Sequence, residues 1–88
     1  MKVMNMKKNK LPKWFDGTLY EIGDVVTNPF SKEEYKLNNI ELSIYDLLMG
    51  ISYIGDHRGW DDEMINIHHK CLNWFRKNNP KAYMVLLD

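Results

Sequence analysis

The 88-residue chain has a single cysteine, only two arginines and no long apolar run. One cysteine excludes an internal disulfide framework and is typical of a reducing compartment. A membrane-spanning helix needs about 20 mostly apolar residues, and a secretory signal needs about 7–15 apolar residues behind its basic start. Neither stretch is present in the sequence. We therefore expect a cytoplasmic protein with no membrane segment.

Aromatic residues, in contrast, are plentiful for so short a chain. The sequence contains three Trp, five Tyr and three Phe, and 44% of its residues are hydrophobic. Such a composition excludes disorder for most of the chain. We predict a flexible basic arm over residues 1–12 and a single small domain over residues 13–88, with a thin core because of its size.

The formal net charge of zero hides a segregation of charge along the chain. Residues 1–15 carry five lysines and no acid, whereas residues 16–63 carry eleven acids against three bases. Residues 64–88 carry four bases and one acid. A basic arm beside an acidic region can bind an acidic partner. It can equally contact the acidic part of a neighbouring copy, and we favour this second interpretation.

The β-structure is predicted between residues 18 and 37. Alternating residues over 18–22 and the β-branched run Val25-Val26-Thr27 indicate strands. Asn28-Pro29 has the chemistry of a turn, and Tyr35 and Leu37 alternate on its far side. The pattern predicts an antiparallel hairpin or meander of two or three strands.

The first long helix is predicted from a strong start signal. Asn38 is a suitable N-cap, and Glu41 three residues later completes a capping box. Apolar residues at helical spacing then continue to Ile54, and Gly55 is the predicted stop. Gly50 lies in mid-helix, where glycine is unfavourable, so we expect another backbone to approach it closely.

Two further helices complete the predicted fold. Asp61 is a suitable N-cap for a helix that ends near Asn78. Asn79 followed by Pro80 then predicts a third, short helix. The fold class is therefore α+β: a small N-terminal antiparallel β-hairpin or meander packed on two main helices, plus a short C-terminal helix.

Three stretches together carry a resemblance to known sequences: VTNPFS at 26–31, ELSIYDLLMG at 41–50 and WFRKNNPKAYMVLLD at 74–88. They resemble small uncharacterised proteins encoded by marine bacteriophages, including phages of cyanobacteria. The resemblance implies a phage or marine origin and a compact domain with a fixed C-terminal segment. That group has no established activity, so the resemblance supplies no catalytic residue.

One cluster of residue types could bind a metal ion. His68 and Cys71 share one helix face, and His57 could fold over from the preceding loop. Zinc sites normally contain two closely spaced pairs of ligands, whereas only one pair is present here. A half-buried core position explains His68 and Cys71 as well, since cysteine is often buried. A metal-dependent enzyme is therefore our third hypothesis, and we expect no resident cofactor.

A second set of residues could contact nucleic acid. Basic residues precede Trp14 and Phe15, whose rings could stack on bases. The basic candidates are Lys7, Lys8, Lys10 and Lys13. The neutral net charge, the acidic middle of the chain and the scarcity of arginine all argue against this function. A nucleic-acid-binding accessory protein is our second hypothesis, and nucleic acid is an unlikely partner in our ranking.

The surplus of aromatic residues supports the leading hypothesis. A thin core cannot cover all of them, and Trp and Tyr are enriched where proteins meet. We therefore expect a non-enzymatic protein–protein interaction module that forms homo-oligomers, with a host or phage protein as a further candidate partner. The candidate contact residues are Trp14, Phe15, Tyr20, Tyr45 and Met49.

Overall fold

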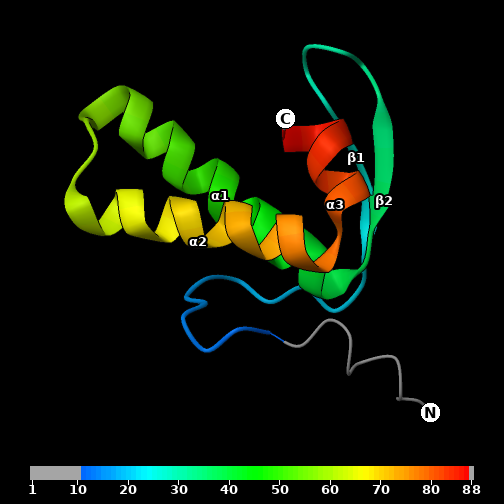
Figure 1. Cartoon of the computed structure of the whole chain (residues 1–88), viewed down its shortest axis with the longest axis horizontal. Coiled ribbons are helices and arrows are strands. Elements are labelled where there is room, and N and C mark those ends of the chain that lie inside the picture. Colours follow the sequence, from blue (N-terminus) through cyan, green and yellow to red (C-terminus); the bar gives the residue numbers. More distant parts are fainter. Residues whose placement is uncertain (1–10, 88) are drawn as a thin grey trace.

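The computed structural model describes residues 11–87, and it confirms the α+β fold. The elements are β1 (Asp24–Thr27), β2 (Glu34–Leu37), α1 (Asn39–Arg58), α2 (Asp62–Asn78), α3 (Pro80–Ala82) and the π-helical turn η2 (Tyr83–Leu87). Figure 1 shows α1 and α2 as a helical pair, with α3 and η2 lying next to the hairpin.

The predicted arm lies largely outside the described residues, which begin at Leu11. Leu11 and Pro12 are half-buried, and Leu11 packs against the hydrophobic core. The packed part of the chain therefore begins before residue 13.

The sheet consists of two antiparallel strands, and its register fixes which side chains face the helices. Asp24 lies opposite Leu37, and Val26 lies opposite Tyr35. Leu37 in β2 is fully buried, whereas Val25 in β1, which points to the opposite face of the sheet, is exposed. The hairpin thus packs one face on the core and leaves the other face to solvent.

Asn28 organises the loop between the strands. Its side-chain oxygen accepts hydrogen bonds from the backbone N–H groups of Phe30 and Ser31 at 2.8 and 3.2 Å. Its side-chain Nδ2 donates to the carbonyl of Val85 in η2 at 2.9 Å. One buried side chain therefore shapes the turn and attaches it to the C-terminal segment.

The possible strand over residues 18–22 is absent from the described structure. The Tyr20 backbone N–H donates instead to Ser43 Oγ at 2.9 Å, and its carbonyl accepts from Asn39 Nδ2 at 3.2 Å. Both partners are side chains of α1. Because side chains of α1 hydrogen-bond to these backbone groups, the segment lies along the helix and forms no third strand.

The predicted start of α1 is confirmed, and its predicted end is wrong. The Asn38 side chain accepts from the Glu41 N–H at 2.8 Å, and the Glu41 carboxylate accepts from the Asn38 N–H at 2.9 Å. The helix continues through Gly55 and ends at Arg58, with Gly59 at a φ of 100° as its cap. Gly59 adopts the backbone conformation that favours glycine and so ends the helix in place of Gly55.

Two glycines have roles that differ from the prediction. Among residues 11–87, nothing lies within 4 Å of the position that a Cβ of Gly50 would take, so the expected close approach of another backbone segment of this domain is wrong. The close approach occurs at Gly23, where a Cβ would overlap the Leu37 carbonyl oxygen. At Gly55 a Cβ would overlap the indole ring of Trp60, which covers the helix there.

The predicted starts of the two later helices are confirmed. Asp61 Oδ1 accepts from the Met64 N–H at 2.8 Å at the start of α2. Asn79 Oδ1 accepts from the Ala82 N–H at 3.1 Å at the start of α3, with Pro80 in the first turn.

A half-buried polar junction joins four elements around Asn79. Its Nδ2 donates to Glu41 Oε2 at 2.8 Å, and its Oδ1 accepts from the Tyr35 hydroxyl at 3.3 Å. Glu41 belongs to α1 and Tyr35 to β2, while Asn79 itself lies between α2 and α3. This junction holds the hairpin, the helical pair and the C-terminal segment in one arrangement.

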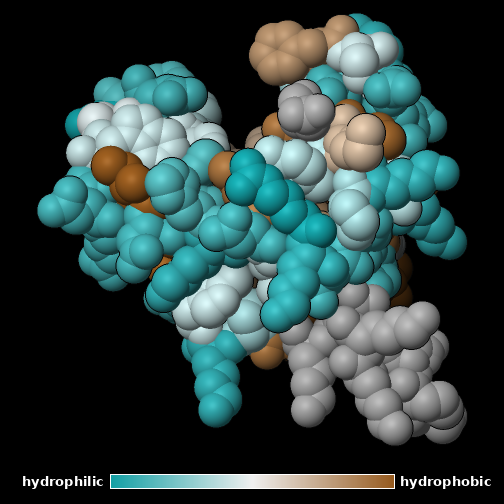
Figure 2. All heavy atoms as spheres, viewed as in Figure 1, coloured by the Kyte–Doolittle hydropathy of each residue, from teal (hydrophilic) through white to brown (hydrophobic). Residues whose placement is uncertain are grey.

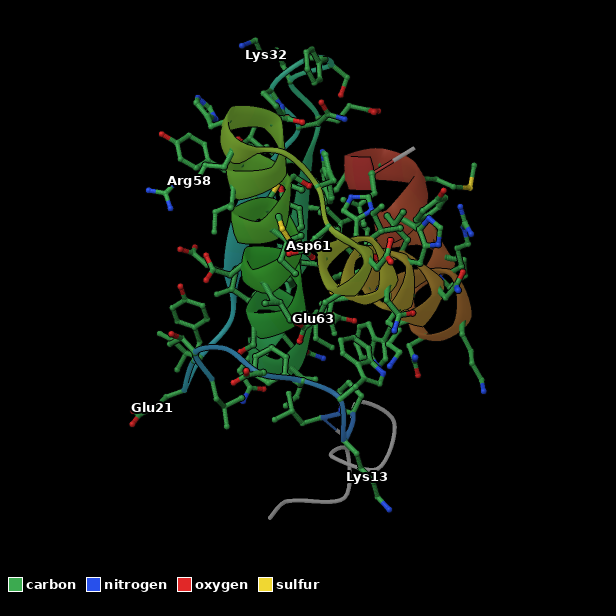
Figure 3. The ribbon with its side chains drawn as sticks, turned by 90° about the vertical axis from the view of Figure 1, so that its left-hand side faces the viewer. Lys13, Glu21, Lys32, Arg58, Asp61 and Glu63 are labelled. Atoms are coloured by element: carbon green, nitrogen blue, oxygen red, sulfur yellow. The ribbon has the colours of Figure 1, made fainter. Side chains whose placement is uncertain are left out.

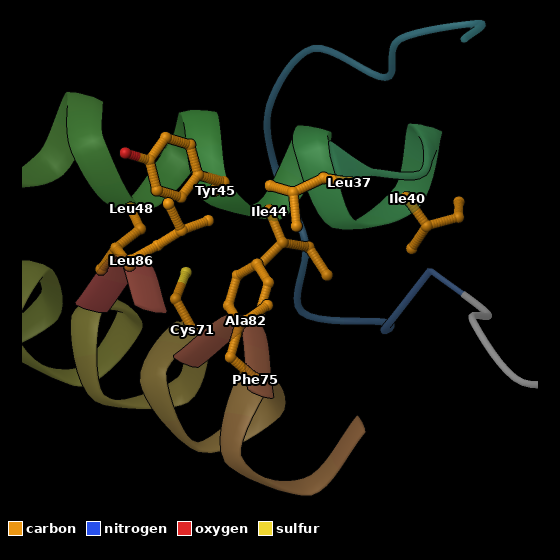
Figure 4. Close-up of a cluster of buried hydrophobic side chains, with 9 residues drawn as sticks. All are labelled: Leu37, Ile40, Ile44, Tyr45, Leu48, Cys71, Phe75, Ala82 and Leu86. Carbon is orange, nitrogen blue, oxygen red and sulfur yellow. The ribbon is translucent and has the colours of Figure 1, made fainter. Parts of the chain in front are cut away.

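The hydrophobic core lies where α1, α2, β2 and the C-terminal segment meet (Figure 4). Its members are Leu37, Ile40, Ile44, Tyr45, Leu48, Cys71, Phe75, Ala82 and Leu86. Nine buried residues make a small core, and ten large hydrophobic side chains remain exposed among those described. On the face shown in Figure 2, hydrophilic residues predominate and hydrophobic residues gather in small patches.

Candidate functional site

The structure does not assemble a metal site from His57, His68 and Cys71. Among residues 11–87, no three His, Cys, Asp or Glu side chains are placed to share one metal ion. His57 lies near the end of α1, where its Nδ1 is 2.9 Å from the Tyr53 carbonyl oxygen and its ring stacks on the Tyr53 ring. The histidine is thus engaged within its own helix.

Cys71 is a core residue. Its side chain is fully buried between the helices, and burial raises the pKa of its thiol to about 12. A thiol of that pKa stays protonated at neutral pH, and thiolate is the form that attacks electrophiles or binds metals. The position therefore serves packing.

His68 packs against Trp60, and their rings meet edge to face at 5.1 Å. Burial lowers the pKa of His68, and the neighbouring His69 lowers it further, while Asp56 acts in the opposite direction. The half-buried His68 ring on α2 therefore contacts the same indole that lies over Gly55 of α1.

The five predicted contact residues do not form one exposed surface. Tyr45 is only 8% exposed and belongs to the core, so its proposed place in an interface is wrong. Its ring fills space between α1 and the C-terminal segment (Figure 4). Trp14, Phe15 and Tyr20 are half-buried, and Met49 on α1 is exposed.

An exposed strip does run along α1, and sequence reasoning identified only part of it. We define the outer strip of α1 as Asp46, Met49, Gly50, Tyr53 and His57, which are all exposed. Their spacing of three or four residues places them on one side of the helix. Ile54 borders the strip and is 48% exposed, and Tyr53 within it is 66% exposed. Tyr53 was missed because its helical spacing also fits a core position.

Tyr20 lies beside the start of the outer strip. The Asp46 carboxylate, as nearby negative charge, is the main cause that raises the pKa of the Tyr20 phenol. This proximity places the 18–22 segment next to α1.

Two hollows lie on either side of Trp14, and they differ in charge. The first, of about 340 Å³, is lined by Trp14, Asp16, Leu47, Ile51, Glu63, Met64 and Ile67. The second, of about 360 Å³, is lined by Trp14, Lys70, Asn73, Trp74, Lys77 and Asn78. Only the first has acidic side chains in its lining, and only the second has lysines.

Of the predicted nucleic-acid contacts, only Lys13 can be placed. It is exposed in the turn that carries Trp14, where the Phe15 N–H donates to the Pro12 carbonyl at 3.1 Å. Lys7, Lys8 and Lys10 lie outside the described residues.

Comparison with known proteins gives no relative: no family model, no curated protein and no solved structure matches this chain. Between residues 11 and 87, no helix combines the length and apolar character needed to cross a membrane. Function must therefore be inferred from the surfaces described above.

Proposed function

We propose that this protein is a non-enzymatic, cytoplasmic interaction module that self-associates through the outer strip of α1. The observation that carries the proposal is the open space over Gly50, flanked by exposed Met49 and Tyr53. The occupant that we propose is the same strip of a second copy.

Gly50 is hard to explain within one chain. A glycine in mid-helix is about 1 kcal/mol less favourable than alanine. No atom of the described part of the chain lies within 4 Å of a Cβ built there, so the monomer would tolerate a side chain at this position. A bare stretch of helix does, however, allow a side chain from a neighbouring molecule to sit directly on the backbone.

The outer strip is complementary to itself. Two copies of α1 packed antiparallel around a two-fold axis between Ile51 and Ser52 would place each Tyr53 over the Gly50 of the other copy. The same arrangement pairs Met49 with Ile54 across the axis. Such an interface uses the same surface on both subunits, as two-fold dimers do.

Charge supports the same pairing. Around that axis, the carboxylate of Asp46 in each copy meets His57 of the other copy. The dimer thus has two Asp46–His57 contacts, one on each side of the apolar centre. His57 Nδ1 already faces the Tyr53 carbonyl oxygen, which leaves Nε2 for the carboxylate. Aromatic and methionine side chains at the centre, with polar groups at the rim, are typical of protein interfaces.

The test is the mass of the tag-free protein by light scattering across a wide range of concentration, compared with the variant Gly50→Gln. We expect a dimer for the wild type. Glutamine fills the open space and favours helix more than glycine does. The variant should therefore be monomeric, and its melting temperature should equal or exceed that of the wild type at a dilution where the wild type is also monomeric.

The matched control is Asn66→Gln, an exposed residue inside α2. It introduces the same side chain on another helix and should leave the dimer intact. A wild-type protein that is monomeric at every concentration, or a Gly50→Gln variant that stays dimeric, would overturn the proposal.

A further inference from the structure

The second hollow beside Trp14 brings together residues from distant parts of the chain. We define the tryptophan groove by its lining residues: Trp14, Lys70, Asn73, Trp74, Lys77 and Asn78. Trp14 comes from the turn before the hairpin, and the others come from the last turns of α2. Lys70, Trp74 and Lys77 are spaced by four and three residues, so they share one side of that helix.

Both indole rings are supported from below. Trp74 is half-buried and meets the fully buried Phe75 edge to face, at 5.1 Å between ring centroids and an angle of 87°. Trp14 is also half-buried and packs against the hydrophobic core. Two flat apolar surfaces therefore border the groove in fixed positions, each with part of its ring open to solvent.

The charges around the groove are positive. Its lining holds two lysines and no acid, and exposed Lys13 is adjacent to Trp14 in the chain. The sequence before Leu11 adds four more lysines and no acid. Although the whole chain is neutral, its acids lie in residues 16–63 and at Asp88, so the residues that form the groove differ in charge from the average of the molecule.

We propose that the tryptophan groove binds single-stranded nucleic acid, a role that is independent of the self-association proposed above. Tryptophan rings offer stacking surfaces for bases, and lysines neutralise the phosphates between them. Asn73 Oδ1 already accepts from Arg76 and Asn78 Nδ2 already donates to the Trp74 carbonyl, which leaves Asn73 Nδ2 and Asn78 Oδ1 to hydrogen-bond to base edges or sugars.

The same residues select for single strands with little regard to sequence. A duplex hides the flat faces of its bases inside the stack, so the indole rings have nothing to stack on. Specific readout of a duplex usually relies on arginine, which is absent from the groove. Stacking tolerates every base because each base has a π-face.

The test uses the full chain and a fluorescein-labelled oligothymidylate of about 15 nucleotides, with anisotropy measured at about 50 mM salt. We expect saturable binding that weakens as salt rises. Trp74→Leu keeps an apolar side chain but removes the stacking surface, and it should weaken binding about tenfold. Circular dichroism verifies that the variant is folded.

The lysines are tested with a matched pair of double variants. The double variant Lys70→Gln, Lys77→Gln removes two phosphate contacts. The plot of log affinity against log salt should therefore become less steep, by about 1.4 in slope. Lys32→Gln with Lys36→Gln removes the same charge from the hairpin, and Figure 3 places Lys32 at the end of the molecule opposite Lys13. This control should bind like the wild type.

Several outcomes would overturn the proposal. The first is no binding at low salt, and the second is an equal loss of affinity in the two pairs of lysine variants. The others are a duplex bound as tightly as the single strand, and full binding by Trp74→Leu.

A mononucleotide that competes as well as the oligonucleotide would reassign the groove to a free nucleotide. Loss of the dimer in Trp74→Leu without any binding of oligonucleotide would reassign it to a protein contact. Gly50→Gln should bind the oligonucleotide normally, which separates this proposal from the proposed dimer.

Discussion

At the scale of single residues, Cys71 shows how burial couples a side chain to stability. Its pKa rises from the ordinary 9.0 to about 12 because the thiolate would be poorly solvated in the core. The unfolded chain therefore releases this proton at a lower pH than the folded chain does. The stability due to the neutral thiol is fully present below pH 9 and is lost as pH rises toward 12.

The expected result is a pH-dependent difference between wild type and Cys71→Ala. The variant lacks the thiol, so its free energy of unfolding should decline less steeply than that of the wild type between pH 9 and about 12. Urea denaturation across this range measures the difference. Tyrosine and lysine titrations affect both proteins alike, so parallel pH profiles would show that the thiol is not buried as described.

At the scale of secondary-structure elements, Asn79 is the main connection. It caps α3 and also bonds to Glu41 and Tyr35. Asn79→Ala should lower the free energy of unfolding by about 2–3 kcal/mol, because a cap is lost and a buried carboxylate loses a partner.

The neighbouring Asn78→Ala is the control, since Asn78 is exposed and bonds only within α2. It should change stability by about 0.5 kcal/mol or less. Equal losses, measured by urea denaturation, would contradict the junction.

Helix starts were predictable because each one is a local event. Asn38, Asp61 and Asn79 accept backbone N–H groups three residues later, and such bonds depend only on neighbouring residues. The end of α1 was not predictable in the same way, since both Gly55 and Gly59 could supply a stop. Trp60, packed over Gly55, accounts for the glycine at that position. The glycine at 55 thus answers to a tertiary contact, and the backbone conformation of Gly59 ends the helix.

The candidate sites depended still more on tertiary structure. The residue types of the tryptophan groove are visible in the sequence, but nothing local brings Trp14 next to Lys70 and Trp74. Tyr45 was misplaced for a related reason. The helical spacing of the apolar residues in α1 predicts burial without saying which side another element covers, and Tyr45 faces the C-terminal segment.

At the scale of the whole molecule, the C-terminal segment is part of the only core among the described residues. Leu86 is buried with the side chains of both long helices, and Asn28 in the hairpin loop bonds to the adjacent Val85. Leu86→Ala should therefore destabilise the entire protein, by about 2–5 kcal/mol. Transitions followed by tryptophan fluorescence and by far-ultraviolet circular dichroism should still coincide, because none of the described elements has a core of its own.

Met84→Ala is the control for this prediction. Met84 lies in the same η2 turn and is 67% exposed, so its truncation should cost about 0.5 kcal/mol or less. If Leu86→Ala instead produced two separate transitions, the C-terminal segment would be an independently melting unit.

The packing of Trp60 on Gly55 has a consequence for how this sequence can diverge. Any side chain at position 55 would occupy the volume of the indole ring, so a substitution there requires Trp60 to move or to change. A homologue with alanine or a larger residue at 55 should carry a smaller residue at 60, turn the indole away, or hold the loop between the helices differently. Covariation of these two positions would therefore identify distant members of this protein's lineage even where overall sequence identity has faded.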